Sequence, residues 1–276
     1  MALIVGIRFH GGGKTYHFDA SAVPEIKKGE YVIVETSRGQ QLGEVVSFLE
    51  PDNKEKRNWK PILRSATSRD LVIRQMWENK EQKVLETCRK LAAEEKSLEE
   101  VKFVSAEFSL EGENLVFLYC YEGNDDPNLG NLLKKLKKDN PKVNLELRRI
   151  GPRDSAKIIG GMGACGREVR CCTEFMTEFI PISIKMAKEQ GISLAPSEIT
   201  GMCGRLRCCL MHEFEQYKEA KKHMPKQGKR VITPQGEGKV IRLNPLSQKV
   251  SVDLGAEGIQ EFDPDQVERV HKRVEK

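Results

Sequence analysis

The two ends of the chain share a pattern of short β-branched and aromatic runs that predicts β-strands. Near the N-terminus, glycine-rich or charged turns separate runs at residues 3–9, 15–18, 31–36 and 42–49. From residue 225 onward, Gly, Pro and Asn turns separate runs at residues 229–234, 238–243, 248–254, 259–262 and 267–270. We therefore predict a small N-terminal β unit over residues 1–62 and a C-terminal SH3-like β barrel over residues 225–276.

The middle of the chain changes to a pattern that alternates between helical and extended spacing. Apolar residues recur with helical spacing among many charges, then in two extended runs, then again with helical spacing. The predicted elements are a helix over 68–96, strands over 101–109 and 114–121, a helix over 128–138 and a strand over 143–150. This order predicts a ferredoxin-like α/β sandwich, covered on one face, within a central domain over residues 63–224. The whole chain is thus assigned to the α+β class.

Composition excludes disordered and membrane-spanning classes. The chain has 276 residues, of which 38% are hydrophobic, so it can bury substantial cores. Every apolar run is interrupted by charges well short of the roughly 18 residues that a membrane span needs. The N-terminus has no basic segment before its apolar run, and it is interpreted as a strand rather than a signal peptide. We expect a soluble, cytoplasmic protein.

The modest net charge of +5 hides a polarised distribution. Residues 131–170 hold eleven Lys or Arg against four Asp or Glu, and residues 201–230 hold eight against three. These two segments together carry +12, so the remainder of the chain carries −7. Basic segments of this kind are candidates for contact with RNA phosphates. The candidate contact residues are Lys134, Lys135, Lys138, Arg148, Arg149 and Arg153.

The eight cysteines fall into two groups with different expected roles. Cys88 lies on the apolar stripe of a predicted helix and Cys120 lies on a predicted strand, so both are expected in a core. The other six form two runs, with Cys165, Cys171 and Cys172 in the first and Cys203, Cys208 and Cys209 in the second. In a reducing cytosol such clusters indicate metal binding or redox chemistry rather than disulfides.

The two cysteine runs are copies of one motif. The first reads GACGREVRCC over residues 163–172, and the second reads GMCGRLRCC over residues 201–209. Both contain a Cys followed by Gly-Arg and end on Arg-Cys-Cys, and the copies begin about 38 residues apart. The spacing therefore predicts an internal repeat of two three-thiol sites, in which flanking glycines allow tight turns.

The chemistry of these runs favours a metal site. Thiolate is the ligand form, and we expect Arg167, Arg170, Arg205 and Arg207 to lower the pKa values of the neighbouring thiols and to offset their charge. The spacing lacks the paired C-x₂-C of a zinc knuckle, so iron–sulfur is favoured, with zinc as the alternative. A cluster takes four thiolates, so ligation is expected to be completed across a partner interface or between the runs. Free buried thiols remain the non-metal interpretation.

Other motifs carry less weight. Gly161, Gly163 and Gly166 match a dinucleotide-binding fingerprint, but Pro152 interrupts the strand that this fingerprint needs, so the match is interpreted as coincidental. His212 follows the second Cys pair, and a solvated helical histidine is preferred over a fourth ligand. The sequence shows no carboxylate pair, nucleophile–base arrangement or H-E-x-x-H element, so it provides no positive case for an enzyme.

Several segments together resemble the YaaT/RicT family of low-GC Gram-positive bacteria, regulators with a polymerase-suppressor-type C-terminal domain. They are RRIGPRDSAKIIGGMGACGR (148–167), SIKMAKEQGISLAPSEITGMCGRLRCC (183–209), VITPQGEGKVIRLNPL (231–246), VETSRGQQLGEVV (34–46) and PILRSAT (61–67). The resemblance implies a non-catalytic adaptor that joins two small helical proteins, RicA and RicF, and is associated with iron–sulfur clusters of the 4Fe-4S type. It further implies a role in steering RNase Y on messenger RNA, with effects on sporulation, competence and biofilm formation.

The resemblance assigns the cluster ligands to the six motif cysteines. One departure concerns the first run, where five residues separate Cys165 from the Cys pair, whereas the family usually has four. Whether Cys171 or Cys172 takes the usual ligand position is therefore left open. Two other functions stay as alternatives: a zinc-stabilised protein that binds RNA or DNA directly through its basic surface, and a redox enzyme that uses vicinal thiols.

Overall fold

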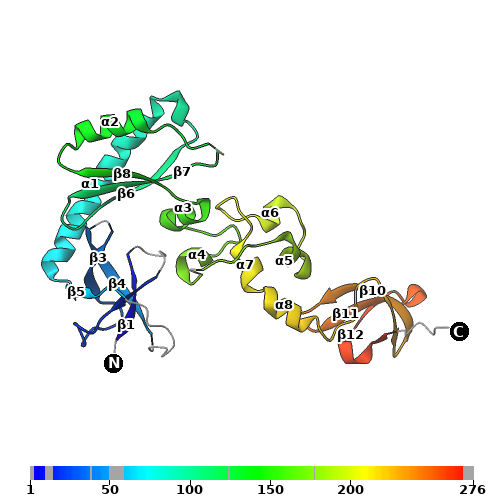
Figure 1. Ribbon diagram of the computed structural model, residues 1–276. Helices are drawn as coiled ribbons and strands as arrows, with labels where there is room; N and C mark the ends of the chain where they lie inside the picture. Colours follow the sequence, from blue (N-terminus) through cyan, green and yellow to red (C-terminus); the bar gives the residue numbers. More distant parts are fainter. Residues whose placement is uncertain are drawn as a thin grey trace. The chain divides into compact units, whose positions relative to one another are not determined.

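The computed structural model describes residues 3–9, 15–37, 39–49, 59–123, 125–176 and 178–269 (Figure 1). Its contacts divide the chain into two compact units. Unit 1 contains residues 1–179 and 201–205, and unit 2 contains residues 180–200 and 206–276. The division falls inside the second cysteine motif, so the turn of that motif belongs to unit 1 and its Cys pair belongs to unit 2.

Unit 1 begins with an antiparallel five-stranded sheet in the order β2-β1-β4-β3-β5. Its strands are β1 (Ile4–Arg8), β2 (Tyr16–Asp19), β3 (Tyr31–Thr36), β4 (Gly39–Leu49) and β5 (Ile62–Ser65). Val5, Ile7, Val32 and Val45 are fully buried in its core, which confirms the four predicted N-terminal strands. Strand β5 was not predicted, because only Ile62 of its four residues is buried and the other three are exposed.

The middle of unit 1 has the predicted order of helix, strand, strand, helix and strand. The elements are α1 (Ser68–Ala93), η1 (Lys96–Leu98), β6 (Lys102–Phe108), β7 (Asn114–Cys120), α2 (Gly130–Asp139) and β8 (Asn144–Arg149). The sheet order is β6-β7-β8; β6 is antiparallel to β7, and β8 is parallel to β7 because α2 makes the crossover (Figure 1). Helices α1 and α2 share one core with the sheet, which includes Cys88, Phe117 and Leu136.

Polar contacts fix α1 at two points along its length. Thr67 and Asp70 form a reciprocal capping box at its start, and Arg64 donates two hydrogen bonds to the Asp70 carboxylate. Farther along, the Glu81 carboxylate is buried and accepts from the Arg74 guanidinium and from the backbone N–H of Phe108 in β6. The second contact fixes the register of α1 against the sheet.

After β8, the segment that carries the first cysteine motif contains two short helices, α3 (Pro152–Ile159) and α4 (Cys171–Glu174). Helix α3 was not predicted; Pro152 starts it rather than interrupting a strand. Because a helix and not a strand precedes Gly161, Gly163 and Gly166, the dinucleotide fingerprint lacks its required context, which confirms that the match is coincidental.

Unit 2 combines a small helical cluster with a second five-stranded sheet. The helices are α5 (Ile184–Glu189), α6 (Pro196–Ile199), α7 (Cys208–His212) and α8 (Phe214–Ala220). Their core contains Met186, Ala187, Ile199 and Leu210. The strands and turns are β9 (Arg230–Thr233), β10 (Gly236–Asn244), β11 (Lys249–Asp253), η2 (Gly255–Glu257), β12 (Ile259–Phe262), η3 (Pro264–Gln266) and β13 (Glu268–Arg269). This sheet has the order β12-β11-β10-β9-β13, which confirms the five predicted C-terminal strands.

The fold is therefore mixed α+β and is built on several separate sheets. The ferredoxin-like and SH3-like assignments stay predictions, as do the domain boundaries at residues 62 and 224. In the part of the chain that the structure describes, no helix is both long enough and apolar enough to span a membrane.

Candidate functional site

The first cysteine motif begins with a tight turn around Cys165. The backbone N–H of Gly163 donates to the carbonyl of Arg167 at 2.8 Å, and the N–H of Gly166 donates to the carbonyl of Gly163 at 3.0 Å. Gly166 has φ of +86°, a conformation that favours glycine over any residue with a Cβ. The turn leaves Cys165 exposed to solvent. Backbone geometry therefore favours the glycine of the Cys-Gly-Arg sequence.

The second motif repeats this turn around Cys203. Gly201 donates to the carbonyl of Arg205 at 2.8 Å, and Gly204 donates to the carbonyl of Gly201 at 3.0 Å. Gly204 has φ of +75°. The same two hydrogen bonds and the same left-handed glycine occur in both turns, so the repeat predicted from the sequence is also a repeat of structure.

Each turn is followed by a short helix whose first two residues are the Cys pair. Cys171 and Cys172 begin α4, and Cys208 and Cys209 begin α7. Each turn is also preceded by a short helix, α3 or α6. We call residues 152–174 the first thiol unit and residues 196–212 the second thiol unit. Cys172 is buried, while Cys171, Cys203, Cys208 and Cys209 are half-buried.

The arginine before each Cys pair donates to backbone carbonyls. The Arg170 guanidinium contacts the carbonyl oxygens of Met162 at 3.1 Å and Ala156 at 2.6 Å. The Arg207 guanidinium contacts those of Thr200 at 3.3 Å and Ser197 at 2.7 Å. Sequence reasoning assigned these two arginines to the thiols and missed this role. Their shared place directly before Cys-Cys was the signal that marked them as a pair.

Arg167 is the arginine that acts on Cys171 in the first motif. Its guanidinium pairs with Glu174 at 2.6 Å and lowers the pKa of Cys171 electrostatically. Burial raises the pKa of Cys171 more strongly, so the net shift is upward from the ordinary value. The prediction that the neighbouring arginines leave a lowered thiol pKa is therefore wrong for Cys171, because loss of hydration outweighs the attraction of the cation.

The six motif thiols suit a soft metal or an iron–sulfur cluster by their donor chemistry. Geometrically, the described residues contain no group of three or more His, Cys, Asp or Glu side chains placed to hold a metal ion. The structure thus shows the motif thiols in two repeated units. His212 is the last residue of α7 and is exposed, as expected for a helical histidine.

The candidate RNA-contact residues have different environments. Lys134 and Lys138 on α2 and Arg148 on β8 are exposed. Lys135 pairs with Glu94 at 3.4 Å and Glu95 at 3.3 Å, and Arg149 pairs with Asp126 at 2.8 Å. The Arg153 guanidinium lies over the Phe179 ring at 4.3 Å. Three of the six cations are thus exposed without an ion pair to another described residue, and the others are engaged within the protein.

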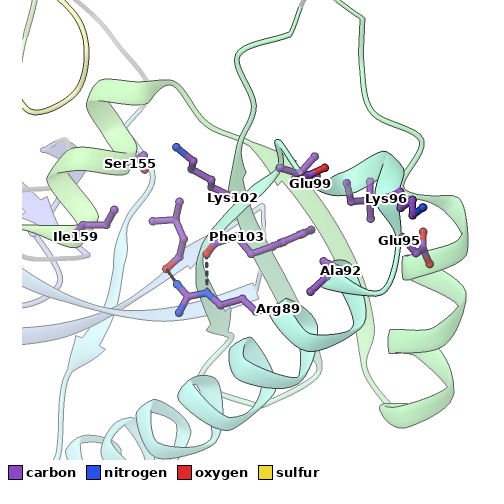
Figure 2. Close-up of a pocket in the computed structure, with 13 residues that line it drawn as sticks. Arg89, Ala92, Glu95, Lys96, Glu99, Lys102, Phe103, Ser155 and Ile159 are labelled. Carbon is purple, nitrogen blue, oxygen red and sulfur yellow. Dashed lines mark hydrogen bonds between the residues drawn. The ribbon is translucent and has the colours of Figure 1, made fainter.

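An open groove of about 920 Å³ lies between the end of α1, the start of β6 and α3 (Figure 2). Figure 2 shows Arg89 under β6, where its guanidinium donates to the carbonyls of Phe103 at 3.0 Å and Val104 at 3.5 Å. The groove also has lysines and glutamates of balanced charge, together with Ser155 and Ile159 of α3. It contains none of the motif thiols, so we do not assign it to their chemistry.

Comparisons with known proteins match part of each unit. The PSP1 C-terminal conserved region matches residues 60–150, which run from β5 through β8, and the third domain of PSP1-like proteins matches residues 181–224, which contain α5 to α8. No solved structure matches the chain. The Stage 0 sporulation protein YaaT of Bacillus subtilis (strain 168) is 37% identical over 258 residues, which cover 91% of this chain and 90% of that protein. The chain therefore belongs to the YaaT family of PSP1-type proteins.

Proposed function

We propose that this chain is a non-catalytic regulatory adaptor of the sporulation pathway that binds iron–sulfur clusters through its motif cysteines. It joins small helical proteins of the RicA and RicF type and modulates mRNA processing by RNase Y, and through that it affects competence and biofilm formation. The observation that carries the proposal is the repeated thiol unit: two copies of one turn followed by a short helix each contain three cysteines. The family relationship to a sporulation protein supports the pathway.

The residues of each unit have separate tasks in this function. The turn glycines allow the first cysteine of each unit to lie on a tight loop, and the helix that follows holds the next two. A common iron–sulfur cluster takes four thiolates, and each thiol unit has three. The fourth ligand therefore comes from the other thiol unit or from a partner protein. When bound, the cluster supplies a cross-link between thiolates that ties their segments together.

The first experiment is metal analysis of the full chain, purified without oxygen from cells that also contain the partner proteins. We expect iron and inorganic sulfide in the wild type and their loss when the cysteines of both motifs are replaced by Ala. Cys120→Ala is the matched control, because it removes a buried thiol that lies outside both motifs. Stoichiometric zinc without iron would overturn the proposal.

A second candidate function is direct binding of RNA or DNA by a zinc-stabilised chain. The exposed lysines on α2 favour it, since Lys134, Lys137 and Lys138 form no ion pair with another described residue. Direct binding predicts that the isolated chain associates with RNA and that the affinity falls steeply with salt. Association only after the partner proteins are added would support the adaptor instead.

A further inference from the structure

We propose that Arg170 and Arg207 are equivalent positioning residues, each of which holds the Cys pair that follows it by clamping the backbone of its own thiol unit. The inference rests on the proposed function only in treating the motif cysteines as the working groups of the protein. The clamp itself is a property of the chain without any bound group.

The two clamps match atom for atom at their first contact. Nε of Arg170 donates to the carbonyl of Met162, the residue directly before the first glycine of its turn. Nε of Arg207 donates to the carbonyl of Thr200, which has the same place before Gly201. The first run has one residue more than the second between its turn and its Cys pair, so the contact is kept although the spacing differs.

The second contact reaches the helix that precedes each turn. A terminal nitrogen of Arg170 donates to Ala156 in α3, and one of Arg207 donates to Ser197 in α6. The carbonyl of Ala156 also accepts the N–H of Gly160 at the end of α3, so it serves two donors. Ser197 lies in the last turn of α6, where carbonyls commonly lack intrahelical partners. A guanidinium can serve two carbonyls together because its five N–H donors lie in one rigid plane. Each arginine therefore joins the preceding helix, the residue before the turn and the next helix.

The clamp acts directly on the cysteines because of where each arginine lies in the helix that follows. Arg170 is the N-cap of α4 and Arg207 is the N-cap of α7, so the Cys pair forms the first two helical residues in both cases. The carbonyl of Arg170 also accepts the N–H groups of Thr173 and Glu174. Fixing the side chain of the N-cap residue thus fixes the start of the helix and both thiols.

The test is alkylation of the reduced, metal-free full chain with N-ethylmaleimide, with the rate at each cysteine measured by peptide mass spectrometry. In Arg170→Ala, we expect Cys171 and Cys172 to react about tenfold faster, because loss of two charge-assisted hydrogen bonds raises the open population of α4. Cys208 and Cys209 should keep their wild-type rates. Arg207→Ala should give the reverse pattern.

Loss of charge alone predicts the opposite result, which makes Arg167→Ala the matched control. Among the described residues, Arg167 bonds to the Glu174 carboxylate and to no backbone carbonyl. Arg167→Ala therefore removes a motif cation but leaves the clamp intact, and it should not speed alkylation of Cys171 and Cys172. Arg170→Lys keeps the positive charge but loses the planar guanidinium. Cys171 and Cys172 should therefore react at a rate between those of the wild type and Arg170→Ala. Unchanged or slower alkylation of Cys171 and Cys172 in Arg170→Ala would overturn the proposal. An equal rise in the alkylation rates of the Cys pairs of both thiol units would also overturn it.

Cys88 reports whether a variant has unfolded, because it is fully buried in the wild type. If Cys88 becomes reactive in an alanine variant, the corresponding lysine variant tests the clamp instead. In that variant, the Cys pair next to the changed arginine must still react faster than the Cys pair of the other thiol unit. The readout needs no iron. Faster alkylation in Arg170→Ala together with an iron-free wild-type protein would therefore reject the cluster and keep the clamp. Unchanged alkylation together with iron in the wild type would reject the clamp and keep the cluster.

Discussion

At the scale of single residues, burial separates cysteines that the sequence presents as the same chemical group. Cys88 is fully buried in the core of α1, α2 and the β6–β8 sheet, and this burial raises the pKa of its thiol to about 12. Cys165 lies on an exposed turn. A thiol that stays protonated at every physiological pH is a small apolar core group, whereas an exposed thiol is available to a ligand or an oxidant.

The raised pKa of Cys88 makes stability fall at high pH. Above the ordinary thiol pKa of 9.0 the unfolded chain loses this proton while the folded chain keeps it, so the free energy of unfolding decreases as pH rises from 9 toward 12. We expect the stability advantage of the wild type over Cys88→Ala to shrink by about 1.4 kcal/mol between pH 8 and pH 10. Urea unfolding at both pH values measures it. A pH-independent difference would show that the thiol titrates alike in both states.

Gly112 joins β6 and β7 in a turn that only glycine fits. Its φ is +76°, and a Cβ there would overlap the Trp77 ring, whose indole N–H donates to the carbonyl of Leu110 at 2.9 Å. We expect Gly112→Ala to lower the free energy of unfolding by about 2–4 kcal/mol, the sum of backbone strain and overpacking. Gly29→Ala is the control: Gly29 has φ of +90° and open space around it, so about 1 kcal/mol is expected. Equal losses in urea unfolding would mean that the Trp77 ring moves aside.

At the scale of elements, the start of α1 depends on a carboxylate that several donors stabilise. Hydrogen bonds from Arg64, and from the side chain and backbone of Thr67, hold the pKa of Asp70 well below its usual value of 3.8. A lowered pKa in the folded state contributes stability above the unfolded pKa, and this contribution is lost as pH falls toward the folded pKa. The capping box of α1 is therefore sensitive to acid.

We expect the wild type to lose about 1 kcal/mol more than Asp70→Asn when pH is lowered from 6 to 3. The variant cannot titrate at this position, so it removes the contribution of Asp70 while the other carboxylates titrate in both proteins. Guanidinium unfolding at pH 6, 4.5 and 3 gives the comparison. Parallel losses in the two proteins would exclude Asp70 as the acid-sensitive group.

At the scale of the whole molecule, the cations of the basic segments differ in whether they are paired with acidic side chains. Lys135 is engaged by Glu95 and Glu94, which follow the end of α1, and these hydrogen bonds raise its pKa. Lys138 is exposed on the same helix. Net charge by segment therefore overstates how many cations are available to a polyanion.

This difference predicts the salt dependence of RNA binding, if the chain binds RNA directly. Replacing Lys134, Lys137 and Lys138 together by Gln should reduce the slope of log affinity against log salt by about 2, because each lost phosphate contact on a single strand removes about 0.7. Lys135→Gln should change the slope less than Lys138→Gln does, because Lys135 is already paired. Filter binding across a salt series measures both. Equal changes of the slope in Lys135→Gln and Lys138→Gln would contradict the view that Lys135 is unavailable to RNA because it is paired.

Much of the fold was predictable because local patterns and tertiary structure agree. The strands at both ends and the α1-β6-β7-α2-β8 order follow from alternation and helical spacing, and Leu145 and Leu147 of β8 contact the core as their alternation predicts. Helix α3 was missed, although Pro152 at its start and Gly160 at its end are typical helix signals. Strand β5 was missed because its exposed residues carry no apolar pattern.

The sequence by itself determined the two three-thiol motifs and their tight turns, because neighbouring cysteines stay neighbours in any fold and a left-handed turn position requires glycine. Only the tertiary structure decided what Arg167, Arg170 and Arg207 do. A guanidinium on its long side chain can reach a thiolate, a carboxylate or a backbone carbonyl, and the sequence does not say which one the packed backbone places within its reach. Arg170 and Arg207 contact carbonyls and Arg167 contacts Glu174, a division of roles that local spacing alone does not encode.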